Sequence, residues 1–202
     1  MIPRVLASLL IGLIGVGGLK GQPSDLFGGD TVRLNEGALV EIWQTVTDQF
    51  FQDDTRVNSC LEHKTEDCAV VFQLMKVVEE ARQYRGKAML GHLNRAINLM
   101  IKPGLGNWTD ALDTIKLGAG DCKSYSIAKY FALLQAGVSA DNLRLAIVYN
   151  QRRSGTHMVV AVRQDETWSI LDNLTMLILS DFEQKTYLPM FVLDYTGVRR
   201  YL

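Results

Sequence analysis

The sequence lacks an excess of charge of either sign. It has 21 basic and 22 acidic residues, a formal net charge of −1 and no long run of like charges. A basic patch is the usual footprint of a nucleic-acid-binding protein, and a polybasic run is what holds a protein electrostatically to a membrane surface. The charge balance therefore predicts no nucleic-acid partner. The chain also has no internal repeat, and its 202 residues suffice for one domain with a sizeable core.

No apolar run is long enough for an ordinary membrane span. The longest uncharged stretch, residues 5–19, has 15 residues and follows Arg4, whereas a span needs ~20. A basic start before a short apolar run is typical of a secretory signal peptide. We predict that residues 1–20 are a signal peptide or, alternatively, an uncleaved N-terminal anchor. Residues 21–202 would then form the exported domain.

Cysteine is scarce, and its spacing leaves two interpretations open. Cys60 and Cys68 lie eight positions apart in a polar stretch, while Cys122 stands alone. An exported protein can join the first two in a disulfide, and a loop this short contributes ~2 kcal/mol in the chain-entropy model. The alternative is a zinc site made by Cys60, His63 and Cys68. Those three ligands fall short of the usual four-ligand pattern, which favours the disulfide.

The order of the predicted elements indicates the fold class. Apolar residues at helical spacing predict helices over 35–51, 68–83 and 87–100, a short helix or turn over 108–117, and then a helix that begins at Cys122. A polar loop is predicted over 52–67. Runs of β-branched and aromatic residues predict antiparallel strands over 143–149, 156–163 and 167–174, and a fourth over 190–193. Helices first and strands afterwards favour an α+β fold, with N-terminal helices packed on an antiparallel sheet.

Cys122 opens a predicted helix and is the candidate nucleophile of the chain. Gly118, Gly120 and Asp121 are start signals for a helix, and Gly137 is a suitable stop. A thiol in the first turn feels the positive end of the helix dipole, and the adjacent Lys123 adds a positive charge. Both lower the pKa of a thiol, as a nucleophile requires. The alternative is a small buried cysteine that serves only the core.

Two residues could complete a catalytic site with this cysteine. His157 opens a predicted strand and Asp172 lies in the next one. If Arg163 pairs with Glu166 across a two-residue turn, then His157 faces Asp172 directly, with their Cβ atoms roughly 5 Å apart. A carboxylate inside an apolar strand needs a partner, and an imidazole supplies one. The pair could equally be a surface contact, but a reactive cysteine, a histidine base and an orienting carboxylate together form a generalised catalytic triad.

These residues also carry a resemblance to a known family. The segments that carry it are Gly120-Asp121-Cys122, Tyr125, residues 127–133, Leu143-Arg144, His157-Met158-Val159, Leu171-Asp172-Asn173-Leu174 and Tyr187-Leu188-Pro189. They resemble the bacterial transglutaminase-like cysteine proteinases, the LapG family, in both order and spacing. The resemblance implies a papain-like fold, periplasmic residence, and Cys122, His157 and Asp172 as nucleophile, base and orienting group. It also implies a large surface adhesin as substrate, a role in biofilm release, and control by an inner-membrane cyclic-di-GMP receptor.

The chain departs from the family pattern at two places. The calcium-dependent members have acidic residues directly after the cysteine, where this chain has Lys123 and Ser124, so Asp121 is the remaining candidate calcium ligand. The Lys123 ammonium could take over part of the metal's electrostatic role, which leaves a calcium requirement in question. After Trp108, the usual proline and glutamate are missing. Trp108 then either lines the cleft or anchors the following helix in the core.

The sequence thus predicts an exported cysteine peptidase that acts through an acyl-enzyme on Cys122. Two alternatives remain open at this point. The same triad could transfer the acyl group to an amine or cleave a small amide, as transglutaminases and amidases do. The fold could also serve as a peptide-binding module without turnover, because a fold alone does not establish a function.

Overall fold

The computed structural model describes residues 26–64, 68–106 and 108–202. The predicted signal peptide or anchor, residues 1–20, lies outside the described residues. Within the described part of the chain, no helix is both long enough and apolar enough to cross a membrane.

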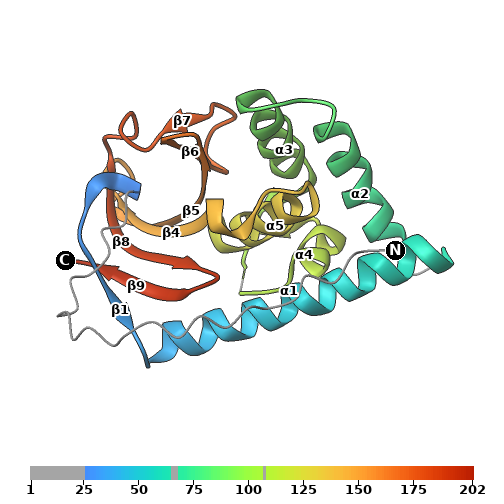
Figure 1. Ribbon diagram of the computed structural model, residues 1–202, viewed down its shortest axis with the longest axis horizontal. Coiled ribbons are helices and arrows are strands. Elements are labelled where there is room, and N and C mark those ends of the chain that lie inside the picture. Colours follow the sequence, from blue (N-terminus) through green and yellow to red (C-terminus); the bar gives the residue numbers. More distant parts are fainter. Residues whose placement is uncertain (1–25, 65–67, 107) are drawn as a thin grey trace, which may run out of the picture.

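The described residues form five α-helices. They are α1 (Ala38–His63), α2 (Ala69–Ala81), α3 (Lys87–Met100), α4 (Ala111–Leu117) and α5 (Cys122–Gln135), with short 3-10 helices η1 (Leu26–Gly28) and η3 (Ala140–Asn142). Helices α2 to α5 lie on one side of the molecule, while the long α1 runs along the bottom of the view, from beneath β9 (Gly197–Tyr201) to that side (Figure 1). The helices predicted over 68–83, 87–100 and from Cys122 are confirmed. Gly137 follows the last residues of α5 with a φ of 90°, a left-handed conformation that suits glycine and ends the helix as expected.

The polar loop predicted over 52–67 is wrong, because α1 continues to His63. The buried side chains of α1 recur every three or four residues from the predicted part of the helix into this stretch, at Val46, Phe50, Asp53, Val57 and Cys60. One buried residue per turn is enough to hold a helix against the core when a neighbouring element covers that stripe. The stretch looks like a loop in the sequence because every other face of this part of the helix is solvated and polar.

A seven-stranded antiparallel sheet forms the other side of the molecule (Figure 1). In chain order its strands are β1 (Thr31–Leu34), β4 (Leu143–Asn150), β5 (Gly155–Gln164), β6 (Thr167–Leu171), β7 (Leu179–Ser180), β8 (Tyr187–Asp194) and β9 (Gly197–Tyr201). Their order across the sheet is β1-β9-β8-β4-β5-β6-β7. A separate parallel pair joins β2 (Lys102–Pro103) to β3 (Ala119–Gly120).

The strand predictions are confirmed for β4, β5 and part of β8, but they miss the end of β6 and two strands at one edge of the sheet. β4 and β5 lie where expected, and the strand predicted over 190–193 forms the middle of β8. The strand predicted over 167–174 ends earlier, at Leu171, so Asp172 lies just beyond β6. β1 and β9 were not predicted. Both are short, and they pair with one another at one edge of the sheet.

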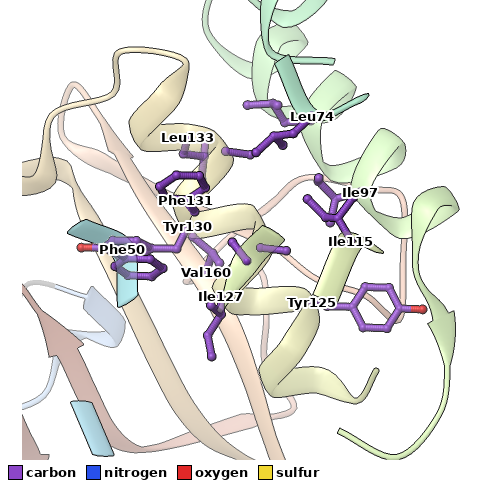
Figure 2. Close-up of a cluster of buried hydrophobic side chains, with 14 of the residues drawn as sticks. Phe50, Leu74, Ile97, Ile115, Tyr125, Ile127, Tyr130, Phe131, Leu133 and Val160 are labelled. Carbon is purple, nitrogen blue, oxygen red and sulfur yellow. The ribbon is translucent and has the colours of Figure 1, made fainter. Parts of the chain in front are cut away.

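The helices and the sheet enclose the main hydrophobic core, whose centre is α5. Residues 124–133 of this helix are all buried, because α2, α3, α4 and the sheet surround it. Figure 2 shows Phe131 and Leu133 of α5 among buried side chains from other elements, including Phe50, Leu74 and Val160. A second, smaller core lies on the opposite face of the sheet and includes Leu26. The fold is α+β, as predicted.

A disulfide joins the end of α1 to the start of α2. Cys60 and Cys68 are bonded, with their Cα atoms 5.5 Å apart. The predicted pairing is confirmed, and the alternative zinc site with His63 is wrong because both thiols are consumed in the bond. Cys122 is the free cysteine of the described residues.

Candidate active site

Asp121 starts the helix that carries the cysteine. Its Oδ1 accepts hydrogen bonds from the backbone N–H groups of Lys123 at 3.0 Å and Ser124 at 3.3 Å, which satisfies two donors of the first turn. A Cβ atom on Gly120 would lie 2.4 Å from the Cβ of Ser124, so the backbone can enter the helix here only through glycine. β2 and β3 fix this entry to the segment after α3. Cys122 thus occupies the first turn of a firmly anchored helix.

The start of α5 lies against an open edge of β5. The pairing of β5 with β6 ends at Val160 and Leu171, so the backbone of Met158 is not engaged by β6. The carbonyl of Met158 accepts a 3.0 Å hydrogen bond from Ser126 Oγ, and its N–H is hydrogen-bonded to the Cys122 thiol. The open strand edge therefore holds the first turns of α5 in place and brings the thiol to His157, the preceding residue.

The structure brings His157 and Asp172 together, but not by the predicted register. Arg163 pairs with Trp168 rather than with Glu166, and the hairpin turns at Asp165 and Glu166. This shift by two residues means that His157 and Asp172 are not opposite each other in a ladder. The chain leaves β6 at Asp172, which frees its carboxylate to reach His157. Nε2 of His157 and Oδ1 of Asp172 are 2.9 Å apart.

Asp172 is held by groups that the sequence analysis did not identify. Tyr187 of β8 donates a hydrogen bond of 2.5 Å to Oδ2, and the backbone N–H of Leu174 donates to Oδ1 at 2.9 Å. Asn98 of α3 donates to the backbone carbonyl of Asp172 at 2.9 Å. Tyr187 stands in a segment that carries the family resemblance, but nothing in its local pattern indicates a role. Its contact with Asp172 depends on the sheet order, which brings β8 close to the end of β6 through β4 and β5.

The three side chains influence one another's protonation. Burial raises the pKa of the Cys122 thiol, but its hydrogen bond and proximity to His157 outweigh burial and hold the pKa below its ordinary value. Burial lowers the pKa of His157, but hydrogen bonds to Asp172 and Cys122 prevail and raise it to about 9. Burial raises the pKa of Asp172, and the hydrogen bonds from His157 and Tyr187 reverse this effect. The site therefore favours a thiolate beside an imidazolium.

A cavity of about 300 Å³ opens onto the thiol and the imidazole. Besides Cys122 and His157, its lining comes from the hairpin between β4 and β5 and from the loop after β6: Asn150, Arg153, Gly155, Thr156, Asn173 and Leu174. A cavity of this size can take the side chain and backbone of a residue next to a scissile bond. Trp108 instead packs against the main hydrophobic core, as the second interpretation of this residue expected.

Asp121 does not have the surroundings of a calcium ligand. One of its carboxylate oxygens caps α5, and the other forms an ion pair with the Lys123 ammonium. Calcium takes six to eight oxygen ligands, and the described residues contain no cluster of three or more His, Cys, Asp or Glu side chains that could hold a metal. Among the described residues, Asp121 therefore lacks the group of neighbouring carboxylates that commonly holds a calcium ion.

Comparison with known families agrees with this geometry. Residues 52–190 match the family described as bacterial transglutaminase-like cysteine proteinase. This match covers more than half of the chain and includes every residue of the Cys122 site. The chain therefore belongs to the bacterial transglutaminase-like cysteine proteinases. As a member of this family it is a cysteine peptidase, and the prediction of an enzyme is confirmed.

Solved structures of one relative share the fold of this cysteine proteinase. The chain is similar in structure to Legionella pneumophila LapG, with a TM-score of 0.61 and 20% sequence identity over 73% of this chain and 86% of the LapG chain. Calcium-bound and EGTA-treated forms of LapG match with the same score. This likeness supports the predicted papain-like, transglutaminase-like α+β fold. No curated protein sequence matches the chain.

Proposed function

We propose that this cysteine proteinase hydrolyses a peptide bond in a protein substrate, with Cys122 as nucleophile, His157 as general base and acid, and Asp172 as the orienting carboxylate. The observation that carries the proposal is the place of His157, hydrogen-bonded to the Cys122 thiol on one side and 2.9 Å from Asp172 on the other. Because Nε2 is engaged by Asp172, the ring nitrogen left for the thiol is Nδ1. This division of roles is the one that a thiolate–imidazolium pair requires.

The reaction then follows from the positions of these groups. The Cys122 thiolate attacks the scissile carbonyl carbon, and the backbone N–H of Cys122 at the helix start stabilises the oxyanion that forms. The His157 imidazolium gives its proton to the departing amine, which leaves a thioester on Cys122. Neutral His157 next takes a proton from water, whose oxygen attacks the thioester and releases the acid product. Thiolate and imidazolium are thereby restored.

On this proposal the enzyme needs no calcium. The Asp121 carboxylate raises the pKa of the Cys122 thiol, and the Lys123 ammonium, paired with Asp121, offsets that negative charge from the chain itself. The proposal is supported by the poor fit of Asp121 to a calcium ion, whereas one of the LapG structures is calcium-bound.

The proposed substrate is a large cell-surface adhesin, cleaved in the periplasm so that cells leave a biofilm. The support is the family membership together with the signal-peptide pattern of residues 1–20. An inner-membrane cyclic-di-GMP receptor is the proposed partner that restrains the enzyme. The assignment of the substrate can be tested in the bacterium that makes this protein. Replacing Cys122 by alanine should keep the adhesin on the cells and increase the attached biomass, and release that persists would contradict the assignment.

The chemistry of the site is tested first, because no substrate is needed. The rate of alkylation of Cys122 is measured against pH for the enzyme and for His157→Ala. An activated pair reacts well below pH 8, and loss of the imidazole shifts the profile towards an ordinary thiol near ~8.5. A thiol that reacts as an ordinary one in both proteins would overturn the proposed mechanism.

A further inference from the structure

A lysine is buried on α5, the helix that packs on β5 and α3, and side chains of both of these elements hold Asp172. Lys129 lies on α5 and is 1% exposed, which makes it one of the largest fully buried side chains of the protein. It stands seven residues after Cys122 and three after Ser126, so the three share the stripe of the helix that faces β5. The same helix stripe therefore carries the nucleophile, the contact to the strand edge, and a buried ammonium.

The ammonium has few partners to offset its burial. Within the described residues it has no hydrogen bond or ion pair, and its Nζ lies 5.8 Å from the centroid of the Tyr125 ring. Asp172 is the charged group whose field reaches it. From α3, the side chains that hold the Asp172 loop are the neutral amides of Asn94 and Asn98.

Packing alone does not explain a lysine at this place. A methionine has nearly the same length and would fill the same space without the cost of burying a charge. Burial lowers the pKa of Lys129 to about 7, against the opposing effect of Asp172. Since the pKa falls on folding, the charge of Lys129 costs stability in acidic and neutral solution. Asp172, the carboxylate on which the proposed active site depends, is the charged group that acts electrostatically on Lys129.

We propose that Lys129 is a positioning residue of the active site, whose buried ammonium stabilises the Asp172 carboxylate and thereby supports the thiolate–imidazolium pair in acidic solution. The inference rests on the proposed roles of Cys122, His157 and Asp172. A positive charge lowers the pKa of every acid near it, so the ammonium helps the Cys122 thiol to ionise. Its influence ends where Lys129 itself loses its proton.

The test is the pH profile of Cys122 alkylation in Lys129→Met. Seven residues of helix separate the two Cα atoms by ~10 Å, and a unit charge at that distance and an effective dielectric of ~20 to 40 shifts a pKa by ~0.5 to 1 unit. We expect the acid limb of the profile to move up by that amount. The alkaline limb, where imidazolium deprotonates, should stay in place because Lys129 is already neutral there. A purely structural role would move neither limb.

Leu133→Ala is the matched control, since Leu133 is also fully buried and lies one turn further along α5. It should lower the free energy of unfolding but leave the pH profile unchanged. Lys129→Gln, which keeps a polar side chain but no charge, should repeat the shift of Lys129→Met. Profiles of both variants that superimpose on the wild-type profile would overturn the proposal.

Two further outcomes are also decisive. If both variants fail to fold, the side-chain NMR titration of Lys129 in the wild-type enzyme takes their place, and a lysine that is neutral throughout pH 5 to 9 overturns the inference. If Cys122 of the wild-type enzyme reacts as an ordinary thiol, the proposed mechanism itself fails, and the result is distinct from an unshifted profile in an activated enzyme.

Discussion

The phenol of Tyr187 donates a 2.5 Å hydrogen bond to Oδ2 of Asp172, while His157 binds the other carboxylate oxygen. The carboxylate is thus fixed from both sides, by one residue of β8 and one of β5. Tyr187 is 7% exposed, and burial and this hydrogen bond together raise the pKa of its phenol, so it stays a donor at every pH of interest. Its hydroxyl keeps Asp172 both ionised and correctly turned towards the imidazole.

Replacing Tyr187 by phenylalanine removes that hydroxyl and little else. A hydrogen bond to a charged group is worth about 1.5 to 3 kcal/mol, so the pKa of Asp172 rises and its hold on His157 weakens. We expect the rate of Cys122 alkylation near pH 6 to fall by about tenfold. Tyr195→Phe is the control, because Tyr195 is 59% exposed. An unchanged alkylation rate with a lower free energy of unfolding would show that Tyr187 serves packing alone.

The calcium question has an equally direct test. We expect alkylation of Cys122 and cleavage of any protein substrate to proceed at the same rate with added calcium and with EGTA. Lys123→Met should slow alkylation below pH 7 severalfold, because it leaves the charge of Asp121, which raises the pKa of the Cys122 thiol, without its ammonium partner. Lys116→Met serves as the control, since Lys116 is exposed on the neighbouring helix. Activity that rises with calcium and is lost on chelation would contradict the proposal and restore a metal site.

The central helix and its cysteine could be predicted because their signals are local. Asp121 caps the helix, Gly137 ends it, and the apolar residues between them follow the helical period. For His157 and Asp172, the sequence predicted that the two residues pair but not the geometry of the pair. The residue types indicated a pair, but its geometry depends on where β6 ends, which is set by packing around Asp172. The turn lies one residue later than predicted, which shifts the pairing of β5 with β6 by two residues, yet His157 and Asp172 still meet.

Long-range contacts account for most of what was missed. Tyr187 and Asn98 reach Asp172 from β8 and α3, and no pattern in either segment points to that loop. Lys129 stands in an otherwise buried helix, and a charged residue there suggests a solvated face until the surrounding elements are known. The extension of α1 was missed for the same reason, because the neighbouring element that covers its narrow stripe cannot be seen in the sequence.

The buried carboxylate of Asp53, on α1, should make the stability of the protein depend on pH. Its Oδ2 accepts hydrogen bonds from the backbone N–H groups of Ala111 and Leu112 at the start of α4. Burial, reinforced by Asp110, raises its pKa from 3.8 to about 6 in spite of these bonds. Between these two values the folded state binds more protons than the unfolded state, so the free energy of unfolding falls as pH rises from about 4 to about 6.

Asp53→Asn should remove this part of the pH dependence while it keeps a carbonyl acceptor for the α4 donors. The measurement is urea unfolding of both proteins at several pH values from 4 to 7, and the quantity of interest is the difference between them. We expect the asparagine variant to gain stability relative to the wild type as pH rises through this window. A difference that stays constant across it would mean that Asp53 ionises in the folded protein as it does in the unfolded chain.

Replacing Asp194 should greatly lower the free energy of unfolding without changing the reactivity of Cys122. Its carboxylate is completely buried and bonds Arg144 at 2.9 Å and Arg199 at 2.5 Å, while its backbone carbonyl accepts from Trp43 of α1 at 2.8 Å. Removing one member of a buried ion pair leaves the other charge uncompensated, at a cost of about 3 to 5 kcal/mol. Both arginines here keep some contact with solvent, so we expect about 3 kcal/mol for Asp194→Ala.

Urea unfolding measures this loss, and Arg200→Ala, at an exposed position of the same strand as Arg199, is the control with little expected change. The pH profile of Cys122 alkylation should be the same in all three proteins, because the ion pairs of Asp194 involve none of the residues that hold the catalytic groups. A loss below about 1 kcal/mol would mean that the cost of burying these charges nearly cancels their attraction. In that case Asp194 would contribute to the arrangement of β8 and β9 against α1 rather than to the stability of the fold.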